Sequence, residues 1–158
     1  MRRIMERLKL VVNESKTHLS CVPDEHFDFL GYTLGRYYST KTGRAFIGTA
    51  PSRKRIERIY RKIHEQTDRR WLLQEAEEMT TRLNRMLIGW SQYFCLGAVS
   101  KAYRAVDAHV RYRLRQWLCA KHKKTGRGTK RYPDSYLYKQ LGLVCLAPRT
   151  HNFPWAKA

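Results

Sequence analysis

The sequence has few acidic residues and no long hydrophobic run. Its 13 Asp and Glu stand against 32 Lys and Arg, so the 158 residues carry a formal net charge of +19. No apolar run approaches the roughly 20 residues that span a bilayer, and the first residues lack the pattern of a signal peptide. With a membrane role disfavoured, so large a positive charge favours nucleic acid as the partner.

Cysteine is also sparse. The four cysteines lie far apart and form no Cys-x-x-Cys pair, which excludes a zinc ribbon and a dense disulfide framework. The six histidines are equally scattered. We therefore expect reduced thiols in a cytosol-like compartment, and no metal or cofactor bound by this chain.

The first 50 residues predict a small α/β unit. The apolar positions of residues 1–10 favour a helix, and the aromatic and β-branched residues of 27–34 favour a strand. Thr42–Gly43 is typical of a hairpin turn between two further short strands. Strands this few do not form a stable sheet by themselves.

After Pro51 the pattern changes to amphipathic helices. A first helix is predicted to begin after Ser52, and two more over 73–94 and 100–121, with Gly97 ending the second. Their apolar stripes predict a three-helix bundle. The residues of the third helix that we expect to face inward are Ala102, Tyr103, Val106, Val110, Leu114, Trp117 and Leu118.

The predicted fold class is therefore mainly α. We divide the chain into the α/β unit of residues 1–50, the helical bundle of residues 51–121, and a tail of residues 122–158. The tail begins with a basic loop, and its residues 135–141 favour one short helix.

The positive charge is concentrated on the helices and on the loop after them. Residues 101–131 contain eleven Lys or Arg and a single acidic residue, Asp107. Solubility alone needs charge of either sign, and mixed charge repels itself less, so we interpret these cations as phosphate contacts. The candidates are Arg104, Arg111, Arg113, Arg115, Lys121, Lys123 and Lys124, followed by Arg55, Arg58 and Lys62 on the first helix. The helical periodicity of these residues is only partial, so we expect some of them to point away from a ligand.

Aromatic residues follow the same helices. A stripe of aromatic residues at helical spacing is more often core than ligand site, so we assign Trp90, Tyr103 and Trp117 to the core. Tyr112 lies off the apolar face, between two arginines. It is the better candidate for stacking on an unpaired base.

Three segments carry a family resemblance. Residues 13–17 read Asn-Glu-Ser-Lys-Thr, residues 27–32 read Phe-Asp-Phe-Leu-Gly-Tyr, and residues 83–94 read Leu-Asn-Arg-Met-Leu-Ile-Gly-Trp-Ser-Gln-Tyr-Phe. In this order they resemble the C-terminal part of group II intron-encoded reverse transcriptases, the maturases. The resemblance covers about residues 5–145. It implies the end of a palm, the palm–thumb junction and the maturase-specific domain, which is also called domain X or the thumb.

The resemblance also implies parts that this sequence does not contain. Members of the family polymerise DNA with a Tyr-x-Asp-Asp turn that holds two Mg²⁺ ions, and this chain has no Asp-Asp pair. Lys16 matches the palm lysine of the family, but no catalytic set is complete. We expect no polymerase activity from the chain alone, and Mg²⁺ only with a complete palm. Fingers and palm are expected on an upstream polypeptide, and the sequence looks like a truncated reading frame without the HNH endonuclease.

We therefore predict an RNA-binding maturase or thumb fragment. It would assist the folding and splicing of group II intron RNA, or hold an RNA–DNA template–primer duplex, in the cytoplasm of a bacterium or in an organelle-like compartment. Three alternatives stay open. They are the C-terminal piece of a split RNA-directed DNA polymerase, a basic protein that binds nucleic acid without specificity, and an inert remnant.

Overall fold

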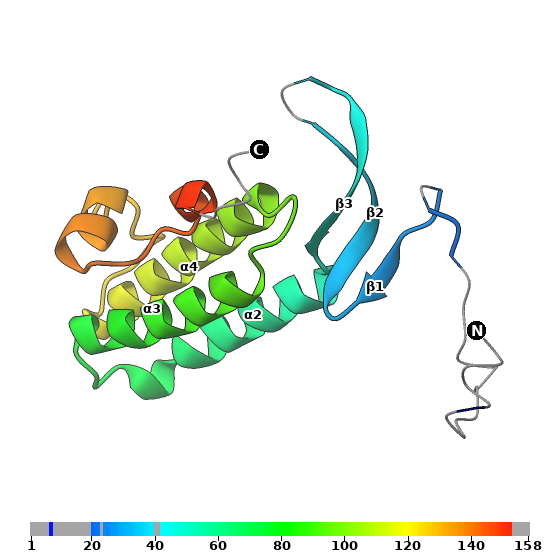
Figure 1. Cartoon of the computed structure of the whole chain (residues 1–158). Coiled ribbons are helices and arrows are strands. Elements are labelled where there is room, and N and C mark those ends of the chain that lie inside the picture. Colours follow the sequence, from blue (N-terminus) through cyan, green and yellow to red (C-terminus); the bar gives the residue numbers. More distant parts are fainter. Residues whose placement is uncertain (1–6, 8–19, 23, 40–41, 153–158) are drawn as a thin grey trace.

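A computed structural model of the chain describes residues 7, 20–22, 24–39 and 42–152, with the backbone alone at 151 and 152. A small sheet leads into three long helices, and a C-terminal segment lies along the later two helices, on the side away from the first (Figure 1). The mainly α fold is confirmed. The helix expected over 1–10 falls outside the described residues except for residue 7, and the turn at 13–17, with Lys16, falls entirely outside them.

The sheet consists of three antiparallel strands in the order β1-β2-β3. Their bounds are Phe27–Phe29, Tyr32–Tyr38 and Ala45–Pro51. The hairpin turn predicted at Thr42–Gly43 is confirmed, because Tyr38 pairs with Ala45 on either side of it. Figure 1 shows the β2–β3 hairpin extending away from the helices, while the other end of β3 leads directly into α2.

The single strand predicted over 27–34 is wrong, because the chain reverses within it. Phe29 pairs with Tyr32, so Leu30 and Gly31 form a two-residue turn between β1 and β2. Both have positive φ, 51° and 88°, as a tight hairpin whose twist matches its strands requires. Glycine adopts this conformation without strain, so Gly31 was the signal for the turn inside an otherwise strand-like pattern.

The helices α2, α3 and α4 span Arg53–Gln66, Ala76–Tyr93 and Ser100–Lys121. The bounds of α4 agree with the prediction. The second helix begins three residues later than predicted, because Gln74 still donates its backbone N–H to Trp71 in the preceding 3-10 turn. Leu73, just before it, is 95% exposed and contributes nothing to the core.

The core lies between the three long helices and the C-terminal segment. All seven residues of α4 that were expected inward are buried, Tyr103 and Trp117 among them. Trp90 is only partly buried and packs against the core from its edge. The assignment of Trp90 to the core therefore holds for one side of the indole only.

Tyr103 fixes the C-terminal end of α3. Its hydroxyl lies 2.8 Å from the carbonyl oxygen of Ser91 and 2.9 Å from that of Phe94, and its single proton is shared between these two acceptors at the end of the helix. Burial raises the pKa of the Tyr103 hydroxyl, so it remains a donor. The helix ends at Tyr93, one residue before the predicted limit of 94. The prediction that Gly97 ends this helix is wrong, because Gly97 lies beyond its last turn. Gly97 has φ +77° and lies against Thr49 of β3, where a Cβ atom would come within 2.2 Å of the Thr49 carbonyl oxygen.

The C-terminal segment is held by two polar side chains of the helices. It contains a π-helical turn at Tyr136–Gln140, within the predicted short helix, and a 3-10 helix at Ala147–Asn152. The Asn84 amide donates to the Gly142 carbonyl oxygen and accepts from the Val144 N–H, each at 2.8 Å. The buried carboxylate of Asp107 accepts two further backbone N–H groups from this segment.

Candidate nucleic-acid interface

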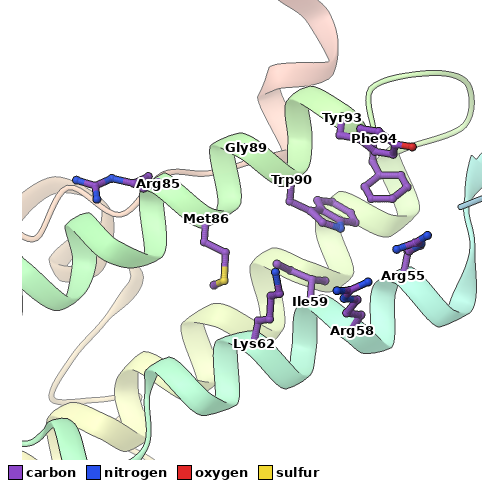
Figure 2. A pocket seen from close by; sticks show the side chains of 10 residues that line it. All are labelled: Arg55, Arg58, Ile59, Lys62, Arg85, Met86, Gly89, Trp90, Tyr93 and Phe94. Carbon is purple, nitrogen blue, oxygen red and sulfur yellow. The ribbon is translucent and has the colours of Figure 1, made fainter. Parts of the chain in front are cut away.

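A groove runs between α2 and α3. It has a volume of about 380 Å³, and four of the side chains that line it are cationic while none is acidic. We call it the cationic groove, and its lining residues are Arg55, Arg58, Ile59, Lys62, Arg85, Met86, Gly89, Trp90, Tyr93 and Phe94. Figure 2 shows the cations of α2 on one wall and the aromatic residues of α3 on the other.

Three of the cations stand on one face of α2. Arg55, Arg58 and Lys62 are spaced three and four residues apart, which places them one above another along a helix. Arg85 comes from α3 and lies at the Met86 end of the groove, apart from the other three (Figure 2). In the part of the chain that the structure describes, none of the four forms an ion pair. Their charge is therefore available to an anionic ligand.

The turn between β1 and β2 positions Arg55. A Cβ atom on Gly31 would lie 2.8 Å from Arg55 Nε, so the arginine side chain packs directly against the turn. The Ser52 N–H donates to the Gly31 carbonyl oxygen at 2.9 Å and holds the start of α2 to the same turn. Arg55 and Arg58 also border a second hollow of about 400 Å³, which is lined in addition by Lys54 and Arg61 and by one acidic residue, Asp28.

Hydrogen bonds donated by the hydroxyl groups of two tyrosines hold the aromatic end of the groove. Tyr32 donates its hydroxyl to the Tyr93 carbonyl oxygen at 2.6 Å, and Tyr93 donates its own hydroxyl to the Leu30 carbonyl oxygen at 3.0 Å. Burial raises the pKa of Tyr32, which keeps its hydroxyl protonated as a donor. Phe94 lies between the rings of Tyr32 and Trp90, with centroid distances of 5.3 and 5.1 Å.

Trp90 brings an unpaired donor to the groove. Its indole N–H is buried and has no hydrogen-bond acceptor among the described residues. Figure 2 shows the indole projecting from α3 toward α2, beside Met86 and Phe94. A buried N–H without an acceptor is costly, so the indole N–H of Trp90 is an unsatisfied polar group at this wall of the groove.

Several cations of α4 that were predicted to contact RNA form hydrogen bonds with oxygen atoms of the protein itself. Arg113 donates to the Thr67 hydroxyl at 3.0 Å and to the Thr67 carbonyl oxygen at 3.2 Å, at the C-terminal end of α2. Lys121 donates to the carbonyl oxygen of Gln74 at 2.7 Å, in the connection to α3. These side chains join α4 to its neighbours. Burial lowers the pKa of the Arg113 guanidinium.

Two further arginines of α4 share one carboxylate. Arg111 and Arg115 both form ion pairs with Asp134, and Arg115 also donates to the Tyr132 carbonyl oxygen at 2.8 Å. The side chain of Arg115 is only 12% exposed. Contact of these arginines with RNA stays a prediction, and their hydrogen-bonding capacity is already partly used.

The remaining predicted residues lie at the surface, away from the cationic groove. Arg104 is exposed near the start of α4, and Lys123 and Lys124 are exposed just after its end. Tyr112 is 53% exposed, as expected of a residue off the apolar face. The structure thus brings Arg55, Arg58 and Lys62 together, while the others are distributed along α4 and its end.

Sequence reasoning missed the contribution of α3 to this groove. Arg85, Gly89 and Tyr93 follow one another at intervals of four residues, which places all three on one face of a helix. That spacing was visible in the sequence. It was not used because the same segment was interpreted mainly through its buried residues.

The described residues show neither a metal-binding cluster nor a membrane-spanning helix. In residues 20–22, 24–39 and 42–152 no group of three or more His, Cys, Asp or Glu is placed to hold a metal ion. None of the helices described here has both the length and the apolar character needed to cross a bilayer. The four cysteines are unbridged, two of them half-buried, Cys119 buried and Cys21 exposed.

Comparison with known protein families places the helices of the groove in a described domain. Residues 56–133 match the model of the family described as group II intron, maturase-specific domain. No curated protein matches the chain. The matched residues comprise nearly all of α2, the whole of α3 and α4, and both walls of the cationic groove except Arg55. The chain therefore belongs to the group II intron maturases, as a C-terminal part that carries the maturase-specific domain.

Proposed function

We propose that this protein binds group II intron RNA in the cationic groove and thereby assists the RNA to fold for splicing. The observation that carries the proposal is the set of four cations that line one groove with Trp90 and form no ion pair in the described chain. Membership of the maturase family supports RNA as the polyanion.

The proposed mechanism is electrostatic. Phosphates of a compact RNA repel one another, and cations placed between them lower the free energy of the compact form relative to the extended one. Each phosphate that the protein neutralises also releases condensed counterions, which favours binding at low salt. Binding free energy alone therefore shifts the RNA toward its folded state, and no bond is made or broken by the protein.

The side chains of the groove suit this task in different ways. Arg55, Arg58 and Arg85 present planar guanidinium groups that donate two parallel hydrogen bonds to one phosphate. Lys62 offers a compact charge that serves phosphates in more than one orientation. Tyr93 is 56% exposed beside them and offers a ring face to an unpaired base.

A competition experiment tests the proposal. The purified chain is titrated with a structured group II intron RNA at about 50 to 200 mM salt, a range over which contacts to phosphates alone weaken strongly. Unrelated RNA, an RNA–DNA hybrid and duplex DNA of equal length are the competitors. Selective binding to the intron RNA that persists at the higher salt supports the proposal, and equal competition by all three contradicts it.

A matched pair of double variants locates the site. Arg58→Gln with Lys62→Gln removes two charges from the groove. Arg53→Gln with Lys101→Gln removes the same two residue types from exposed positions that do not line it. The groove variant is expected to bind intron RNA about tenfold or more weakly than the control variant. Equal affinities would place the RNA elsewhere on the protein.

A further inference from the structure

Gly89 differs from the other glycines of the chain. Six of the nine have positive φ, which favours glycine whatever the surroundings. Of the remaining three, Gly35 and Gly48 are packed so closely that a Cβ atom would lie 2.2 Å from His26 and 2.7 Å from Phe46. Gly89 has neither property, because no described atom other than its chain neighbours and the adjacent backbone of its own helix lies within 4 Å of the position that its Cβ atom would take.

The fold itself gives no reason for a glycine at this position. Gly89 stands in the interior of α3, where glycine is the poorest helix former apart from proline and alanine the best. Alanine would fit the space and would stabilise the helix. Packing among the described residues and backbone conformation are therefore both excluded as explanations.

The location of Gly89 supplies a reason for the glycine. It lines the cationic groove, one helical turn after Arg85 and one before Tyr93, as Figure 2 shows. A glycine between two large side chains leaves a gap on the helix surface where another backbone can approach closely. The next residue, Trp90, has a buried indole N–H that lacks an acceptor among the described residues.

We propose that the sugar–phosphate backbone of the bound RNA lies directly against α3 at Gly89. Phosphates on either side of this contact are held by Arg85 at one end of the groove and by Arg58 and Lys62 of α2 across it. The proposal rests on the proposed function. It adds Gly89 to the binding site, because a residue without a side chain leaves room for the RNA backbone. Gly89 sets how closely the ligand approaches the helix.

The test uses substitutions that stabilise the protein and fill the gap. Gly89→Ala and Gly89→Leu replace glycine by good helix formers, so the Tm is expected to rise by about 2 to 6 °C. Binding to intron RNA is expected to weaken in the same order, about threefold for alanine and tenfold or more for leucine, because atoms are forced into an occupied contact. The control is Thr81→Leu, which adds the same side chain at an exposed position of α3 outside the groove.

The possible outcomes separate this inference from the proposed function. Higher stability with graded loss of binding at Gly89, and unchanged binding for Thr81→Leu, supports the inference. If the Gly89 variants bind as tightly as the native protein while Arg58→Gln with Lys62→Gln binds weakly, the inference fails and the proposed function stands. If no groove variant weakens binding, both fail. A lower Tm for Gly89→Ala would show an unrecognised packing role and would also overturn the inference.

Discussion

The carboxylate of Asp107 accepts the backbone N–H of Leu146 at 2.9 Å, across 39 residues of sequence. The same carboxylate accepts the N–H of Ala147, also at 2.9 Å. Asp107 is buried on α4, and Leu146 is fully buried beside it. A buried acidic residue, one of the few in this basic chain, thus attaches the C-terminal segment to the helical bundle.

Replacing Asp107 by alanine is therefore expected to be strongly destabilising. One buried and one part-buried N–H group would lose their acceptor, and the free energy of unfolding is expected to fall by about 3 kcal/mol. Urea unfolding followed by circular dichroism measures the change. Asp107→Asn retains one acceptor oxygen and should lose less. An alanine variant as stable as the native protein would show that the C-terminal segment is not held through this carboxylate.

Arg113 is expected to serve stability more than binding. Its two hydrogen bonds to Thr67 close the C-terminal end of α2 onto α4, and Arg113→Ala leaves both oxygens without this donor. We expect a loss of about 1 to 3 kcal/mol in the free energy of unfolding. Arg104→Ala, at an exposed position of the same helix, should change it by less than about 0.5 kcal/mol. Equal stability of the two variants would contradict this assignment.

The salt dependence of RNA binding is expected to decrease by one step for each cation of the groove that is removed. Each phosphate contact that is lost lowers the slope of log K against log salt by about 0.7 for single strands and 0.9 for duplex. Arg58→Gln should therefore lower the slope by one such step, and Arg58→Gln with Lys62→Gln by two. Anisotropy titrations of labelled RNA at several salt concentrations give the slope. Arg53→Gln is the control, and an equal change there would mean that only net charge matters.

Tyr112 provides a test of the stacking hypothesis drawn from the sequence. Its ring is 53% exposed and lies outside the core, so Tyr112→Ala should leave the Tm unchanged. If the ring stacks on an unpaired base, binding of single-stranded RNA should weaken by about 1 to 3 kcal/mol, while binding of duplex should not change. Tyr38→Ala, at a similarly exposed tyrosine of the hairpin, is the control. Unchanged single-strand binding would contradict the hypothesis.

His109 is expected to make the stability of the fold depend on pH. Its ring stacks on Tyr60 of α2, with centroids 4.2 Å apart. Burial, and then the positive charge of Arg113, lower the pKa of His109 in the folded protein. As the pH falls, the unfolded chain therefore binds the proton first, near the ordinary histidine value of about 6.5. The contribution of neutral His109 to the free energy of unfolding is fully present above about pH 6.5. It is lost as the pH decreases from there toward the lower pKa of the folded state.

Urea unfolding at about pH 7.5 and about pH 5.5 measures this loss. His109→Phe preserves a ring that can stack on Tyr60 but carries no titrating group. We expect the phenylalanine variant to lose clearly less stability between the two pH values than the native protein. An equal loss in both proteins would assign the pH dependence to other groups.

The helices and their buried faces could be predicted because apolar periodicity is a local property of the sequence. Ser100–Lys121 and its inward residues follow from spacing alone, since a helix of this length has one stripe that must be covered. The reversal at Leu30–Gly31 was missed because the flanking residues have strand character on both sides. There a single glycine decides the conformation against its neighbours.

The candidate site was harder to predict, because it depends on contacts between distant segments. Spacing placed Arg55, Arg58 and Lys62 on one face of α2, but it did not identify α3 as the facing wall of a groove. Nor does sequence tell which cations find an oxygen within the protein. The partners of Arg113 and Lys121 lie 46 and 47 residues away, and the fold alone brings them within reach.

The β1–β2 turn has a consequence for the groove as a whole. Tyr93 of α3 donates to Leu30, and Ser52 at the start of α2 donates its N–H to Gly31, so both walls are attached to the same two-residue turn. The sheet therefore sets the width of the groove at its aromatic end. A partner that displaces the sheet would change the affinity of the groove without touching it, and a ligand in the groove would in turn change the affinity for that partner.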